Sequence, residues 1–193
     1  MKDLLVMKFG GTSMGSAERI RVAGQITAGQ QGARPVMVVV SAMAKITDLL
    51  LDSLRRAEAG DEAGLEADIE KLRERHVAAC RELLPPDGHE AAIEAIHRLV
   101  GEFQRIANGV LMLGVRPPRS VDEAIAIGER LSALLMTAHL EARDVRAVTV
   151  SGAEVIVTDA VFGGASPLME QTWEKSRQLL LPLLEAGVVP VVT

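Results

Sequence analysis

The sequence predicts an α/β protein, a three-layer sandwich in which helices cover a mostly parallel sheet. Two observations lead to this prediction. Short apolar runs lack the polar alternation of half-exposed strands, as expected for parallel strands that are buried on both faces. Segments with apolar residues at helical spacing separate these runs, which indicates helices between the strands. The runs fall at residues 4–9, 36–40, 147–150, 155–157 and 188–192.

The segments between the runs are predicted to be helical. Residues 17–31 carry Ile20 and Ala23 at the spacing of one helical face. The charged segment of about residues 60–114 is expected to form two long structural helices, with a break at the Pro-Pro-Asp-Gly sequence of residues 85–88. Further helices are expected at residues 47–59, 121–142 and 170–186.

The chain of 193 residues is within the size range of one domain. It stops at Thr193, at the carboxyl end of an expected core strand. In open α/β sheets the ligand crevice lies just outside those strand ends. We therefore expect a truncated domain, which lacks a loop that would help to build its site.

The composition disfavours several classes of function. Aromatic residues make up 2% of the chain, which disfavours base stacking as a mode of binding, and a net charge of -5 offers no basic footprint for nucleic acid or anionic lipid. We expect neither a membrane partner nor a signal peptide, because the apolar runs are too short. Cys80 is the single cysteine, which favours a reducing, cytoplasmic location.

The first candidate site follows the first predicted strand. Lys8 is followed by the paired glycines Gly10 and Gly11 and by the hydroxyl residues Thr12 and Ser13. Paired glycines let backbone N–H groups approach a phosphate, and the helix N-terminus behind them favours negative charge. Lysine at this place could neutralise a transferring phosphoryl group. The alternative is a tight turn in which one of the two hydroxyls caps the next helix.

The second candidate site is the end of the run at residues 36–40. Ser41 and Thr47 place hydroxyl groups near a strand end, where ligands bind in such sheets. The alternative is that Thr47 or Asp48 only caps the following helix.

The third candidate is Glu129, which lies on an otherwise apolar helical face. A carboxylate on such a face is costly unless it is paired. Glu129 could therefore receive the ammonium group of an amino-acid substrate. The alternatives are a salt bridge to Arg130 or Arg119, or exposure at the helix edge.

Together the three segments resemble the aspartate kinase branch of the amino-acid kinase superfamily. The resemblance rests on Lys-Phe-Gly-Gly-Thr-Ser at 8–13, on Val-Val-Ser-Ala-Met at 39–43 with Thr47, and on Pro-Arg-Ser-Val-Asp at 118–122 leading to Gly-Glu-Arg-Leu-Ser at 128–132. It implies that residues 1–193 are the N-terminal part of an amino-acid kinase-like catalytic domain. The C-terminal ATP-binding part and the regulatory ACT domains of the family would then be absent.

The resemblance also implies a reaction. The expected activity is ATP-dependent phosphorylation of the side-chain carboxylate of L-aspartate to 4-phospho-L-aspartate, the first step of the lysine, threonine and methionine pathway, with Mg²⁺ as the metal. The fragment alone is expected to be inactive. Lys8 would contact the transferring phosphoryl group. The residues assigned to ATP are Lys8, Gly10, Gly11, Thr12 and Ser13, and those assigned to L-aspartate are Ser41, Thr47 and Glu129.

Two alternatives remain open. The chain could belong to another amino-acid kinase, for glutamate or acetylglutamate, although the Gly-Glu-Arg-Leu-Ser segment and the long helical pair argue against it. It could also be a non-catalytic half-domain that serves as an assembly module. An unfinished sheet edge tends to recruit a partner, so we expect a homo-oligomer. Ala44 and Ala126 depart from the family, which usually has glycine at the first position and often serine at the second. No residue is assigned as a metal ligand.

Overall fold

A parallel four-stranded sheet organises the protein. The computed structural model describes residues 3–193. The sheet contains β1 (Leu5–Phe9), β2 (Val36–Val40), β3 (Ala147–Val150) and β4 (Val189–Val192), in the spatial order β1-β2-β4-β3. Every neighbouring pair is parallel, so the carboxyl ends of all four strands lie at one edge of the sheet.

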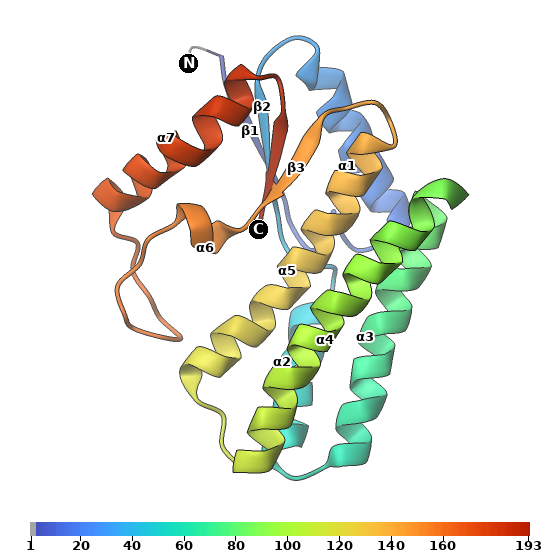
Figure 1. Ribbon diagram of the computed structural model, residues 1–193, viewed down its shortest axis with the longest axis vertical. Coiled ribbons are helices and arrows are strands. Elements are labelled where there is room, and N and C mark those ends of the chain that lie inside the picture. Colours follow the sequence, from blue (N-terminus) through green and yellow to red (C-terminus); the bar gives the residue numbers. More distant parts are fainter. Residues whose placement is uncertain (1–2) are drawn as a thin grey trace.

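Helices cover both faces of the sheet (Figure 1). The helices α1 (Ala17–Gln31) and α5 (Pro118–Glu141) pack on one face, and α7 (Met169–Glu185) packs on the other, next to the short α6 (Gly152–Val155). This arrangement confirms the predicted α/β sandwich.

Three more helices form a bundle with α5 that extends well beyond the sheet (Figure 1). They are α2 (Ile46–Glu58), α3 (Glu62–Leu83) and α4 (His89–Leu113), and the 3-10 turn η1 (Pro86–Gly88) separates the last two. The charged segment therefore forms two long helices with the predicted break.

Local signals explain where several helices begin and end. The Ser16 hydroxyl accepts a hydrogen bond from Arg19 N at 3.3 Å and caps α1. The Asp61 carboxylate does the same for α3, through Gly64 N at 2.9 Å. Gly114, with φ at 64°, ends α4 in the left-handed conformation that glycine adopts without strain.

The core has two parts, one on each face of the sheet. Alternate residues of β2 share the main cluster with α1, α5 and the bundle, while Met37 and Val39 point toward a smaller cluster under α7. β1 departs from the prediction of strands buried on both faces, since Val6 is 49% exposed. The reason is position, because β1 is an edge strand and α7 packs against β4.

The strand predicted at residues 155–157 is wrong. Ser151 and Glu154 form a capping box that starts the helical turn α6 directly after β3. Val155 ends that turn and is buried in the smaller cluster. Its apolar character therefore reflects packing under α7 and not a place in the sheet.

Candidate functional site

Lys8 lies next to the glycine loop that follows β1. The loop is a tight turn, in which Met14 N donates to Gly10 O at 3.0 Å and Gly15 N donates to Thr12 O at 3.3 Å. A Cβ atom at Gly10 would lie 3.4 Å from the Lys8 Nζ. The ammonium group of the lysine therefore folds back over the loop.

The hydroxyl groups of this loop do not cap α1. Ser16 holds the capping position, so the capping alternative for Thr12 and Ser13 is wrong. Both side chains are exposed to solvent, beside the glycines.

The loop after β2 lies against the glycine loop. A Cβ atom at Gly11 would lie 3.2 Å from the carbonyl oxygen of Ala42, closer than ordinary van der Waals contact. Ser41 N donates to Phe9 O at 3.1 Å and extends the pairing of β1 with β2 to the start of both loops. The two predicted segments thus meet at the carboxyl edge of the sheet.

The start of α2 gives Thr47 no capping role. Lys45 occupies the cap position with φ at 65°, and no side chain caps the helix. Thr47 and Asp48 lie inside the first turn and are exposed, so the capping alternative is wrong here too. Because the left-handed residue is Lys45, Ala44 fits at the place where the family usually has glycine.

Close packing brings Glu129 to the same edge. A Cβ atom at Gly128 would lie 3.0 Å from both Ala42 Cβ and Ile46 Cγ2, so α5 touches the loop after β2 and the start of α2. Only a glycine allows this approach without a shift of its neighbours. The next residue, Glu129, is half-buried there.

Two opposite influences act on Glu129. Burial raises the pKa of its carboxyl group, and the positive charge of Lys8 lowers it in part. The salt-bridge alternatives are wrong, since Arg130 pairs with Glu102 at 2.5 Å and Arg119 lies over an aromatic ring of the loop before α7. Within residues 3–193, Glu129 forms no salt bridge.

A pocket of about 220 Å³ opens beside this carboxylate. Two of the predicted aspartate-binding residues line it, whereas Ser41 does not. Its walls are Thr47, Asp122, Ile125, Ala126 and Glu129. The sequence reasoning missed Asp122 as a lining residue, although its spacing of two turns from Glu129 places both on one face of α5.

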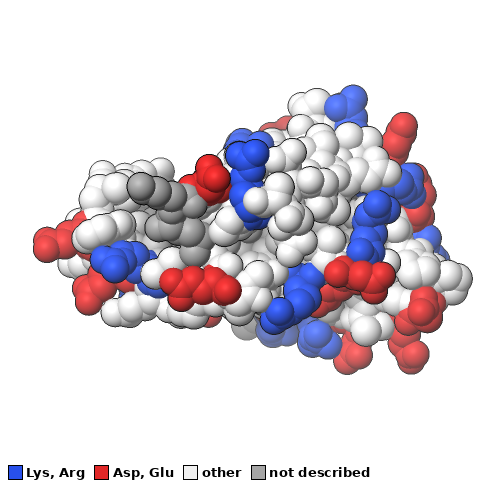
Figure 2. Space-filling view, turned by 90° about the horizontal axis from the view of Figure 1, so that it is seen from above, with Lys and Arg blue, Asp and Glu red and all other residues white. Residues whose placement is uncertain are grey.

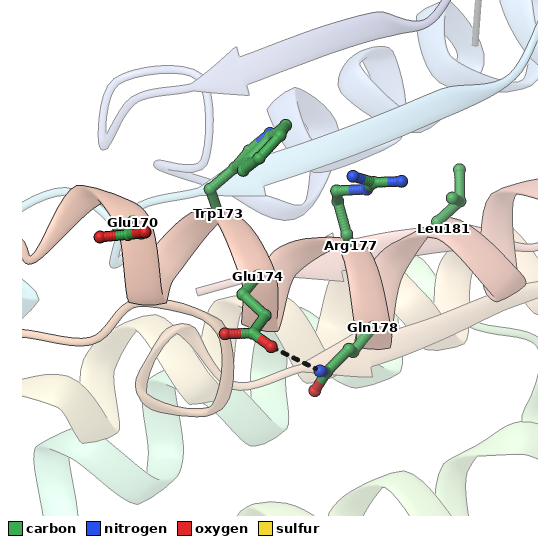
Figure 3. Close-up of a pocket in the computed structure, with 6 residues that line it drawn as sticks. All are labelled: Glu170, Trp173, Glu174, Arg177, Gln178 and Leu181. Carbon is green, nitrogen blue, oxygen red and sulfur yellow. Dashed lines mark hydrogen bonds between the residues drawn. The ribbon is translucent and has the colours of Figure 1, made fainter.

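A larger depression lies elsewhere, on the outer face of α7 (Figure 3). Its volume is about 470 Å³, and the residues that line it all belong to α7. The Arg177 guanidinium lies 5.1 Å from the centroid of the Trp173 ring, and Gln178 donates to Glu174 at 3.5 Å. None of the predicted site residues lines this depression.

Charges are mixed over the molecule. Figure 2 shows acidic and basic side chains interspersed on the face seen from above, without a broad patch of one sign among the described residues. Residues 3–193 contain no group of three His, Cys, Asp or Glu side chains placed to hold a metal ion, and no helix among them is long and apolar enough to cross a membrane.

Comparison with known proteins identifies the family. The pattern of the amino acid kinase family matches residues 3–193. The chain belongs to the amino acid kinase family. Among its relatives in this family are the aspartokinases of Chlamydia muridarum, 34% identical over 177 residues, and Chlamydia trachomatis, 35% identical over 174 residues. These alignments cover 89% and 88% of this chain, and the chain spans 36% of the length of either relative.

Solved structures of this family agree with the fold. Escherichia coli aspartokinase III in complex with aspartate and ADP superposes with a TM-score of 0.87 at 29% identity, over 98% of this chain and 40% of that one. The same protein with lysine and aspartate gives a TM-score of 0.86, again at 29% identity and with the same coverage. The predicted resemblance to the aspartate kinase branch is confirmed.

Proposed function

We propose that the protein is an aspartate kinase, to which this chain contributes the aspartate pocket and the loop that faces the ATP phosphates. The reaction would move the γ-phosphoryl group of ATP to the side-chain carboxylate of L-aspartate and give 4-phospho-L-aspartate. One observation carries the proposal: Glu129 is half-buried without an ion-pair partner in residues 3–193, in a pocket beside Lys8 and the glycine loop. The neighbour solved with aspartate and ADP supports it.

Glu129 would bind the α-ammonium group of L-aspartate. Its burial disfavours the charged carboxylate, and a cation that enters the pocket would compensate for this cost. Thr47, on the same pocket, would offer its exposed hydroxyl to a carboxylate of the substrate. Ser41 lies at the end of the neighbouring strand and would complete the aspartate site from that side.

Lys8 would face the phosphoryl group in transfer. Its ammonium lies over Gly10, so a phosphate that approaches the backbone of the loop also meets a positive charge. Gly10 and Gly11 would line the ATP phosphates, with Thr12 and Ser13 nearby as exposed hydroxyl donors.

The chemical step needs no strong general base. The side-chain carboxylate of aspartate is ionised at pH 7, so one of its oxygens can attack the γ-phosphorus directly. A new bond forms between that oxygen and phosphorus, the bond from phosphorus to the β–γ bridging oxygen breaks, and ADP leaves with the electron pair. The protein contributes position and charge neutralisation, which fits the residues at this edge.

Magnesium would enter with the nucleotide. Residues 3–193 contain no group of three His, Cys, Asp or Glu side chains placed to hold a metal ion. Mg²⁺ commonly binds substrate phosphates together with one or two carboxylates. We therefore assign no residue of this chain to the metal.

Further parts of the proposal concern the whole protein. The chain spans 36% to 40% of the Chlamydia and Escherichia coli relatives, and we propose that it is inactive without the remainder of the catalytic domain. The activity would serve as the first step of lysine, threonine and methionine synthesis. A homo-oligomer and a cytoplasmic location are also proposed, the latter because the chain has one cysteine, which is buried.

An acyl-phosphate assay tests the proposal. The complete gene product is incubated with ATP, Mg²⁺ and L-aspartate, and hydroxylamine traps the product as a hydroxamate while ADP is measured in parallel. We expect both signals to depend on L-aspartate and to be lost in Lys8→Ala. Turnover of L-glutamate or N-acetyl-L-glutamate in place of L-aspartate would overturn the substrate assignment.

A further inference from the structure

The loop between α6 and α7 contains a preformed hairpin, which we call the strap (residues 158–167). An isolated bridge between its first and last residues closes the base. Inside it, Asp159 N donates to Ser166 O at 3.0 Å, and the Asp159 carboxylate accepts from both Val161 N and Ser166 N at 3.2 Å. The strap therefore holds its own shape and can act as one unit.

The tip of the strap is attached to the first turns of α5 (Figure 1). Gly163 N donates to the Asp122 carboxylate at 2.8 Å, and the Arg119 guanidinium lies 5.8 Å from the centroid of the Phe162 ring. Gly163 has φ at 79°, a conformation that other residues rarely adopt. The tip conformation thus presents this N–H group to Asp122.

Asp122 also lines the pocket, together with Thr47 and Glu129. One side chain therefore touches both the strap and the proposed aspartate pocket. Phe162 remains 50% exposed, so the tip is attached at its edge and is not buried in the core. Attachment of this kind can open when a ligand enters and close when it is bound.

We propose that Asp122 is a positioning residue, which holds the strap beside the pocket and thereby sets how tightly the amino-acid acceptor is bound. This inference rests on the proposed function. The strap supplies none of the residues that line the pocket, so its effect on the acceptor passes through Asp122, whose carboxylate the Gly163 N–H holds at the pocket wall. Asp122 acts through the Gly163 N–H, so it is the accepting oxygen that matters and not the negative charge.

Steady-state kinetics of the complete gene product test this role. Asp122→Ala removes the acceptor, Asp122→Asn keeps an acceptor oxygen without the charge, and Glu123→Ala is a matched control, since Glu123 is an exposed acid at the same end of α5. We expect Asp122→Ala to raise the KM for L-aspartate about tenfold, the upper range for the loss of one hydrogen bond, with the KM for ATP unchanged. Asp122→Asn should stay near the wild-type KM, and Glu123→Ala should match wild type.

Hydrogen exchange of the strap gives a readout that does not depend on turnover. Faster exchange of the peptide that contains Gly163 is expected in Asp122→Ala, and wild-type exchange in Asp122→Asn. The inference is overturned if Asp122→Asn is as impaired as Asp122→Ala, because the charge would then act on the substrate directly. It is also overturned if the strap opens in Asp122→Ala while the KM for L-aspartate stays the same.

The failure of the proposed function has a different signature. A wild-type protein that forms no ADP with L-aspartate overturns that function and the inference built on it. A wild-type protein that turns over L-aspartate, with kinetics that Asp122→Ala does not change, overturns the inference alone.

Discussion

Two carboxylates of the helical bundle have opposite surroundings. Asp68 of α3 is almost fully buried and is paired twice, with Arg56 Nε at 3.0 Å and Lys71 Nζ at 3.1 Å. Glu129 of α5 is half-buried at the carboxyl edge of the sheet and forms no salt bridge within residues 3–193. A buried charge that the fold pairs has a structural role, whereas one left without a partner is suited to bind a ligand of opposite charge.

The depression on α7 and the pocket beside Glu129 also differ in the surroundings of their charged side chains. The depression on α7 is larger, but the charged side chains that line it are exposed and come from one helix (Figure 3). The smaller pocket joins α2 to α5 and contains a carboxylate whose pKa is raised by burial. Size alone would select the depression on α7, whereas the carboxylate without a salt bridge favours the smaller pocket, which we propose for an amino-acid substrate.

The largest expected effect is a loss of kcat on substitution of Lys8, which lies near Glu129 at the candidate site. Lys8→Ala should lower kcat by about a thousandfold, because it removes a preorganised positive charge next to the phosphoryl group. The melting temperature should change little, since Lys8 is exposed. Turnover and thermal melting of the complete gene product measure the two effects. A variant with near-normal kcat would remove Lys8 from the catalytic role.

A buried histidine of α3, outside the candidate site, should make the free energy of unfolding depend on pH. Burial lowers the pKa of His76 from 6.5 to about 4. Between these values the unfolded chain binds a proton that the folded protein does not, so the free energy of unfolding rises with pH across this window. The full contribution is present above pH 6.5, and about 3 kcal/mol should be lost by pH 4.

Urea unfolding at several pH values checks this dependence. His76→Leu should flatten the pH profile between 4 and 6.5, whatever its effect on overall stability. His97→Gln is the control, because His97 is an exposed histidine of α4. Profiles of equal slope in wild type and His76→Leu would contradict the expectation.

Much of the fold was predictable where the signal is local. The bounds of α1 agree with the prediction, because Ser16 caps it and its apolar residues follow one face. The residues at 155–157 were misread, since a short apolar run gives the same pattern in a strand and in a helical turn, and only Val155 is buried under α7.

The residues of the candidate site could be proposed from the sequence, but the sequence does not show that Glu129 forms no salt bridge within residues 3–193. Arg130 and Arg119 are close to Glu129 in sequence, and only the packing of α5 shows that they face Glu102 and the strap. Asp122 was missed for the same reason, because its hydrogen bond joins two segments that are distant along the chain.

Glu129→Gln should have a smaller effect on activity than Lys8→Ala. The KM for L-aspartate should rise by roughly thirtyfold, as expected when a charge-assisted contact to the ammonium group is lost, and the KM for ATP should stay within the error. The free energy of unfolding should not fall, because burial disfavours the charged form of Glu129, as the raised pKa of its carboxyl group indicates, and the substitution removes that charge. A large loss of stability would instead assign Glu129 to the fold.

The smallest functional effect, with a clear loss of stability, is expected for Asp68→Asn. It leaves Arg56 and Lys71 without their shared carboxylate, although both cations are about half exposed or more, so the loss should be about 2 kcal/mol. Urea unfolding measures it, and the kinetics with L-aspartate should match wild type. A variant that keeps its stability but loses affinity for L-aspartate would contradict the structural role of Asp68.

The most direct test compares two ligands that differ in one group. Succinate is aspartate without the ammonium group, so the ratio of the two dissociation constants isolates the contact with that group. Wild-type protein should bind L-aspartate more tightly than succinate, and Glu129→Gln should lose most of this preference by weakening aspartate binding alone. Calorimetric titration of both ligands measures the ratio. An unchanged ratio in Glu129→Gln would contradict the assignment of Glu129 to the substrate ammonium.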